Sequence, residues 1–263
     1  MINAMQAAII KKDFRSVVSN KRLLPALIVV PFMFTVFLPT VFILGIHFAL
    51  EEMGSFQMLI NLLPIGKRGD TLNRTLIMLV LNNIMPIFFT MIPIMAASIM
   101  AASSFVGEKE KRTLETLLYC PLPLKKIFQS KVWASFLLSM VVSFSSFFVM
   151  LIIVEVQIVL TTGSLLLPDI SWLVMMLVVS PAVSLLAITL IVGGSAKAQT
   201  MEESQQRAIV LILPVLLLIG GQFMGIILVN AWYLLGAGGI FALLAAIMMK
   251  RSMRGFAYET LLR

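Results

Sequence analysis

The long apolar stretches of this chain limit what it can fold into more than any other feature. The longest is the run of 42 residues from Ala208 to Met249, which contains almost no polar side chain. A single helix of that length would measure about 63 Å at 1.5 Å per residue, roughly twice the hydrocarbon core of a bilayer. The run must therefore cross a membrane twice, and Asn230 is the expected point of return.

The composition also indicates a membrane protein. Of the 263 residues, 60% are hydrophobic and only 12% are charged, and the mean hydropathy is +1.04. A soluble domain of this size would have too little polar surface to stay dissolved. We therefore expect an all-α integral membrane protein with a single transmembrane domain over residues 1–263 and no cleavable signal peptide.

Six apolar runs are long enough to cross a bilayer, which takes about 20 helical residues. The expected spans are residues 23–48, 76–103, 132–154, 171–194, 208–229 and 231–249. Prolines predict bends in the first span and, at Pro181, in the fourth. The small residues AASIMAAS in the second span predict close helix contacts.

Residues 1–22 precede the first span and have an amphipathic pattern. Apolar side chains share one broad face, and Lys11, Lys12 and Arg15 lie on the other. This pattern predicts a helix at the membrane interface with its cations toward anionic lipid, although an ordinary basic flank is the plainer alternative.

The basic residues indicate the orientation. Six spans put both termini on one side, and 17 of the 20 Lys and Arg residues fall on that side. Because positive charge gathers on the cytoplasmic side of membrane proteins, we expect both termini and the polar segment 104–131 in the cytoplasm. The cations flank apolar runs and form no continuous stripe, so the net charge of +8 does not indicate nucleic-acid binding.

The polar segment 104–131 predicts a cytoplasmic hairpin between the second and third spans. Helix-forming residues dominate from Glu108 to Leu118, and pairs of opposite charge four residues apart support a short exposed helix. Pro121 and Pro123 end it. We expect the charges of this helix to face water and its leucines to face the membrane bundle, which suits the docking of a partner.

Several kinds of chemistry are missing. No phosphate-binding G-x-x-x-x-G-K-[ST] motif occurs, and one histidine and one cysteine cannot build a metal centre, a catalytic pair or a disulfide. The E-E-x-x-x-R sequence at 202–207 is similar to a motif of intramembrane proteases, which also need later histidines. We interpret it as a solvated turn whose acids begin the next helix. We therefore expect no catalytic, cofactor or metal site, and no enzyme.

Charged residues are also missing from the centres of the six predicted spans. A charge at the bilayer centre costs roughly 2.5–3.5 kcal/mol on insertion scales, so charges are kept there mainly for function. Their absence argues against a proton-coupled carrier or an ion pump. The energy for any transport should come from outside the bilayer.

The polar segment resembles that of the membrane subunits of ATP-binding-cassette exporters of the second type, the ABC-2 family. The residues that carry the resemblance are Phe105, Glu108-Lys109-Glu110, Arg112-Thr113-Leu114-Glu115, Leu117-Leu118, Pro121 and Lys131. Arg112 stands where many members have glycine. The link at 197–207 also resembles the second cytoplasmic link of the family.

The resemblance implies a permease in the bacterial cell membrane. It would pair with a second permease, identical or related, and would be powered by two separate cytoplasmic ATPase subunits that bind the ATP. The helix that begins at Glu108 would be the coupling helix seated in the ATPase. The implied coupling residues are Glu108, Glu110, Arg112, Thr113, Glu115 and Leu118.

Composition and residue spacing also indicate a cargo class and a dimer contact. An uncharged interior rich in Met and Phe favours export of an amphipathic peptide or a drug-like hydrophobic compound. A non-transporting immunity or sensory subunit for antimicrobial peptides is the alternative. The pair Gly221 and Gly225, spaced as G-x-x-x-G, is a candidate packing face for a dimer.

Overall fold

The structure, a computed structural model, describes residues 4–48, 72–111, 113, 122–163, 165, 168–195, 198–223 and 231–255. Within these ranges the regular elements are all helical. Six helical segments are long and apolar enough to span a membrane, namely Leu23–Ile46, Arg74–Glu110, Leu124–Thr161, Ile170–Ser195, Met201–Gln222 and Ala231–Met253. The predicted all-α membrane fold with six spans is confirmed at this level; Asn230 lies outside the described residues.

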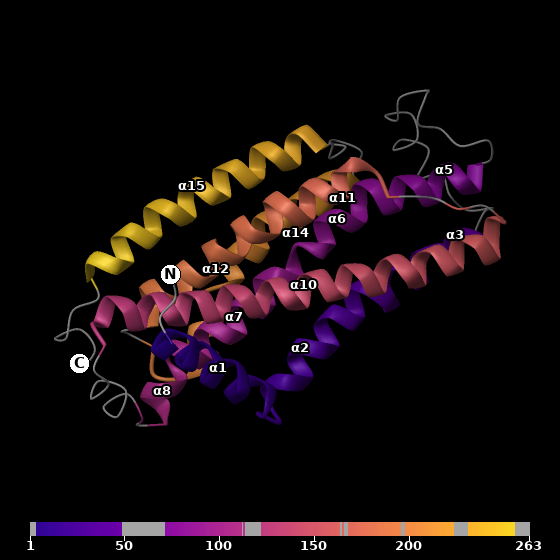
Figure 1. Ribbon diagram of the computed structural model, residues 1–263. Coiled ribbons are helices and arrows are strands. Elements are labelled where there is room, and N and C mark those ends of the chain that lie inside the picture. The colour runs from indigo at the N-terminus through magenta and orange to yellow at the C-terminus, as the bar shows by residue number, and fades with distance from the viewer. Residues whose placement is uncertain are drawn as a thin grey trace.

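The helices form an elongated bundle (Figure 1). The first half of the chain contains α1 (Ala4–Val18), α2 (Leu23–Phe32), η1 (Met33–Phe37), α3 (Leu38–Phe48), α5 (Leu72–Leu79), η3 (Val80–Ile84), α6 (Met85–Phe89), α7 (Met91–Phe105) and α8 (Gly107–Glu110). The second half contains α10 (Leu124–Thr162), α11 (Ile170–Val174), η4 (Met175–Val179), α12 (Ser180–Ser195), α13 (Met201–Gln206), α14 (Ile209–Phe223) and α15 (Ala231–Gly255). Figure 1 shows α1, α8 and the C-terminal end of α15 at one end of the bundle.

Among the described residues, three spans contain a π-helical turn, and each of these turns ends two residues before a proline. These turns are η1 before Pro39, η3 before Pro86 and η4 before Pro181. The residue that precedes each proline donates its N–H to the carbonyl five residues back, as Leu38 does to Met33, Met85 to Val80 and Ser180 to Met175. A proline has no N–H for the usual bond, and the wider turn accommodates its ring within a continuous span.

The π turn η3 also leaves a backbone carbonyl for a neighbouring helix to bind. Because Met85 bonds Val80, and Pro86 has no N–H, the Leu81 carbonyl has neither an α-helical nor a π-helical partner. The indole Nε1–H of Trp172 donates to this carbonyl at 3.0 Å. This bond joins η3 of the second span to α11 at the start of the fourth span.

The centre of the bundle is α7, which is buried almost throughout and packs against α10 and α12. Its small side chains, including Ala97, Ser98 and Ala101, allow the three helices to approach closely, as the sequence predicted. By contrast, α2, α14 and α15 are largely exposed on the outside of the bundle.

The helix of the third span is longer than predicted. A separate short helix was expected before residue 132 and a loop after residue 154, but the structure has the single 39-residue helix α10 there. The bounds of the span itself, 132–154, stay a prediction. No proline or glycine interrupts the chain from Leu124 to Thr162, so nothing in the backbone ends the helix at either membrane surface. It ends at Gly163, whose φ of 69° is the left-handed conformation that closes many helices.

Candidate functional site

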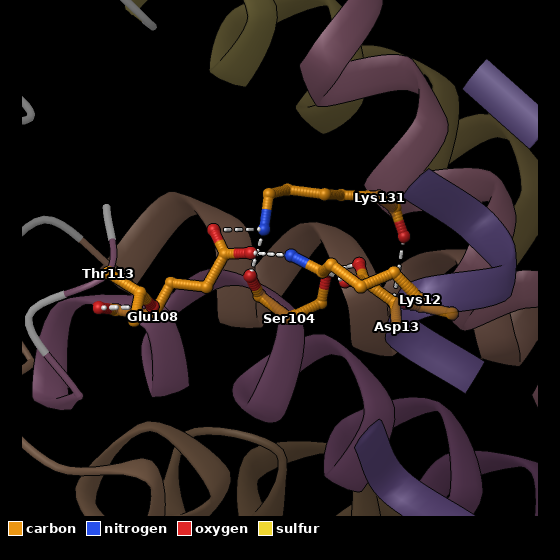
Figure 2. Close-up of polar contacts among 7 residues, drawn as sticks. Lys12, Asp13, Ser104, Glu108, Thr113 and Lys131 are labelled. Carbon is orange, nitrogen blue, oxygen red and sulfur yellow. Dashed lines mark hydrogen bonds and ion pairs between the residues drawn. The ribbon is translucent and has the colours of Figure 1, made fainter. Parts of the chain in front are cut away.

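Buried charge is concentrated at one place in the part of the chain that the structure describes. The buried charged side chains there are Asp13, Glu108 and Lys131, which are 4%, 7% and 3% exposed. They come from α1, α8 and α10 and meet at the end of the bundle where these helices converge (Figure 2). Together with Lys12 and Ser104 they form what we call the Glu108 network.

The carboxylate of Glu108 is held by two lysines. Lys131 Nζ donates to Oε2 at 2.7 Å, and Lys12 Nζ donates to Oε1. The ammonium of Lys131 also donates to the backbone carbonyl of Ser104 and lies 5.5 Å from the ring centre of Phe105. Figure 2 shows both ammonium groups directed at the one carboxylate. Glu108 therefore links α1 and α10 through a single side chain.

Asp13 completes the network from the side of α1. Its carboxylate accepts a hydrogen bond from Ser104 Oγ on α7 and lies 3.3 Å from Lys12 Nζ. Two lysines and two carboxylates make the network neutral in sum. Charges can be kept out of water only when they are paired and hydrogen bonded, and this arrangement satisfies that condition.

The protonation of Lys12 follows from its neighbours. Burial by itself would lower the pKa of Lys12, but the hydrogen bond to Glu108 and the charges of Asp13 and Glu108 outweigh it. The pKa of Lys12 consequently lies above its ordinary value of 10.5, so the ammonium keeps its charge at physiological pH.

The position of Asp13 follows from the pattern of α1. Gln6, Ile9, Asp13 and Val17 recur at helical spacing and are the buried residues of this helix. This mixed face packs against α10, and Gln6 Nε2 donates to the Lys126 carbonyl at 3.5 Å. The helix is therefore docked on the bundle through polar as well as apolar groups. Its placement at the bilayer surface stays a prediction.

The structure corrects the expected position of Glu108. The sequence predicted an exposed charge, whereas Glu108 is buried because both of its lysine partners approach from the bundle side. Glu110 and Thr113 are exposed, and Thr113 donates its N–H to the Glu108 carbonyl at 2.8 Å. Three of the predicted coupling residues lie outside the described ranges: Arg112, Glu115 and Leu118. The coupling roles of all six stay predictions.

Glu110 connects α8 to the second polar link. Its Oε2 accepts the backbone N–H of Met201 at 3.1 Å, at the start of α13. A Cβ on Gly107 would lie 3.1 Å from the sulfur of Met201, so the two segments are in close contact there. The segments before the third and fifth spans are thus joined.

The acids at 202–207 begin a helix, as expected. Thr200 accepts the N–H of Glu203 at 3.2 Å, and Glu203 accepts the N–H of Gln199 at 2.8 Å, a reciprocal cap at the start of α13. Within the described ranges, no group of three or more His, Cys, Asp or Glu residues could hold a metal ion. The motif is accounted for as a helix start.

Sequence reasoning missed Lys12, Asp13 and Ser104 as members of the network, and it assigned Lys131 only to the family pattern. One sequence feature does indicate that Asp13 pairs with a cation: it is the only acid before Glu51 and lies among five cations. Of the candidate dimer pair, Gly221 is partly buried in α14 and Gly225 lies outside the described residues.

Comparison with known proteins identifies the family. The model of the ABC-2 family transporter proteins matches residues 7–237, which include the whole Glu108 network and reach into the last span. No curated protein matches the sequence. A match over most of the chain, together with six apolar helices, shows that this multi-pass membrane protein belongs to the ABC-2 transporter family.

Proposed function

We propose that this chain is the permease subunit of an ATP-driven exporter in the bacterial cell membrane, with its termini in the cytoplasm. Separate ATP-binding-cassette subunits would bind and hydrolyse the ATP, and a second permease, identical or related, would complete the transport path. Family membership supports the permease assignment. The observation that supports coupling through the 104–131 segment is the Glu108 network, which links this segment to α1, α7 and α10.

In this proposal Glu108 holds α8 to α1 and α10 and does not itself contact the ATPase. Both of its oxygens are bound by lysines, so a displacement of α8 must either carry α1 and α10 along or pull this buried carboxylate away from the buried Lys131 and the half-exposed Lys12. Separating a buried charge from its partner costs roughly 3–5 kcal/mol. The helices should therefore move together when an ATPase pushes on the adjoining segment. The third span would tilt with them, because α10 is one continuous helix.

Glu110 would pass the same displacement to the other half of the molecule. It is exposed, so it can meet a partner, and it already bonds the first residue of α13. Because α13 leads into the fifth span, a partner that moves α8 would also move the start of α14. We therefore propose Glu110, together with Glu115, as the acidic contacts for the ATPase.

The proposed cargo is an amphipathic peptide or a hydrophobic drug-like compound. Within the described residues, buried charge is confined to one end of the bundle, so the remaining buried core has no charged group to recognise an ionic cargo. Abundant Met and Phe side chains support binding of varied apolar surfaces.

Purification from the native host and reconstitution in vesicles tests this function. We expect an ATP-binding-cassette subunit to co-purify, and ATP to drive transport of a fluorescent hydrophobic peptide. The Glu110→Lys variant should lose the ATPase, and the exposed Glu202→Lys, at the start of α13, serves as the matched control. Transport without any nucleotide-hydrolysing partner would contradict the proposal. Peptide binding without transport would favour the immunity or sensory alternative.

A further inference from the structure

A cavity of about 490 Å³ lies between the spans, away from the Glu108 network. Its floor is formed by deeply buried side chains of the second and fourth spans, among them Ile94 and Leu186, which are 1% and 4% exposed. Its other wall is formed by α14 and α15. The rim includes exposed side chains, such as Leu218 at 38% and Ile240 at 60%, so the cavity opens to the outside of the bundle.

The cavity exists because the last two spans pack on different partners. The helix α14 packs against α6 and α7, whereas α15 packs against α12 and η4. A Cβ on Gly238 would lie 2.9 Å from Val178, so this glycine brings α15 close to the fourth span. A Cβ on Gly236, which lines the cavity, would meet nothing within 4 Å. Close packing explains the glycine at 238 but not the one at 236, where the helix borders open space.

The chemistry of the lining excludes a water-filled space. No lining residue is charged, and the side chains with a polar atom are Thr90, Trp232 and Tyr233. The hydroxyl of Thr90 already donates to the Ile87 carbonyl at 2.6 Å. A buried water needs two to four polar partners, whereas an apolar cavity of about 150 Å³ in another protein stays dry and takes up benzene. A space about three times larger is suited to a hydrocarbon of many carbons.

The two exposed aromatic side chains indicate how such a ligand is oriented. Trp232 and Tyr233 are 79% and 67% exposed and lie in the first turn of α15. Figure 1 shows that α15 begins at its end farther from α1 and α8. Tryptophan and tyrosine are enriched where the hydrocarbon core meets the headgroups, because one part of the ring is apolar and the other polar. A polar headgroup therefore belongs beside this pair, with the attached chain running past Gly236 toward Ile94.

We propose that this cavity binds one acyl chain of a phospholipid from the leaflet at the Trp232 end. The opening lies on the apolar outer surface of the bundle, the lining is uncharged, and an exposed aromatic pair borders the cavity, as a headgroup requires. Lipid binding goes beyond the proposed export function and does not depend on it, because it needs neither an ATPase nor a cargo.

Photolabelling tests the occupant directly. The full chain is reconstituted with phosphatidylcholine that carries a diazirine midway along one acyl chain, and the adducts are mapped by mass spectrometry. We expect adducts on the floor residues Ile94 and Leu186, which lipid outside the bundle cannot reach. The Gly236→Phe variant should reduce these floor adducts at least fivefold by filling the cavity.

The matched control is Gly239→Phe on the same helix. A Cβ on Gly239 also meets nothing within 4 Å, but this residue does not line the cavity. The Gly239→Phe variant should give as many adducts on the floor residues as the unaltered chain. Both variants should unfold at similar temperatures. Labelling confined to exposed residues such as Leu217 and Leu243, or floor adducts that persist in Gly236→Phe, would overturn the proposal. A disulfide between two chains that carry Gly236→Cys would also overturn it, because the occupant would then be a second copy.

Discussion

At the scale of single residues, the Glu108 network shows how one carboxylate can join three helices. Its oxygens are bound by Lys12 from α1 and Lys131 from α10, while α7 contributes Ser104 to Lys131 and to Asp13. Each member is buried or partly buried beside an opposite charge. Removal of the Glu108 carboxylate therefore leaves Lys131 without a partner of opposite charge in a place that water hardly reaches.

Neutralising Glu108 should destabilise the protein strongly. The Glu108→Gln variant leaves Lys131, which is 3% exposed, without a carboxylate, and we expect a loss of about 3 kcal/mol or more in the free energy of unfolding. The same change at the exposed Glu202 should alter it by less than about 0.5 kcal/mol. Thermal unfolding in detergent measures both. Equal midpoints for the two variants would show that the network does not stabilise the fold.

The raised pKa of Lys12 predicts the pH range over which this lysine stabilises the fold. A lysine whose pKa is raised on folding contributes stability that is fully present below its unfolded value of 10.5 and is lost as pH rises through the higher folded value. The difference in unfolding midpoint between the unaltered chain and Lys12→Gln should therefore be constant from about pH 6 to 9. It should shrink only above about pH 10.5. A difference that already disappears by pH 9 would contradict the pairing.

At the scale of elements, the proline turns show what the sequence could and could not predict. Apolar length and proline position were enough to place the spans and the irregularities in the first and fourth, because both are local properties of the chain. The bond from Trp172 to the carbonyl freed at η3 depends on the packing of two spans that lie far apart in the sequence. The hydropathy of the sequence does not predict the length of α10, because the helix continues beyond the apolar run at both ends.

The bond at η3 predicts the effect of replacing Trp172. The Trp172→Phe variant keeps an aromatic ring but leaves the Leu81 carbonyl without its donor, and a buried unsatisfied group costs about 1–3 kcal/mol. Trp232→Phe is the matched control, since Trp232 is 79% exposed, and it should change stability little. Thermal unfolding of the two variants provides the comparison. A smaller loss for Trp172→Phe than for Trp232→Phe would show that η3 does not need this partner.

At the scale of the whole molecule, the buried charges and the large apolar cavity lie in different parts of the bundle. The buried charges among the described residues lie where α1, α8 and α10 meet, and the large apolar cavity lies between the second, fourth, fifth and sixth spans. The sequence alone predicted the polar segment between the second and third spans, because a polar stretch between apolar runs is visible without a structure. Its role in docking stays a prediction. It could not predict that Glu108 turns inward, since the partners are 96 and 23 residues away and only folding brings them together.

The most direct test of the proposed coupling is the number of cargo molecules exported per ATP hydrolysed. It is measured in vesicles that contain this chain and its ATPase, for the unaltered protein, Glu108→Gln and Glu202→Gln. If the Glu108 network transmits the motion, Glu108→Gln should keep the ATPase bound and hydrolysing while this ratio falls at least tenfold, and Glu202→Gln should leave it unchanged. An unaltered ratio in a folded Glu108→Gln protein would contradict transmission through the network.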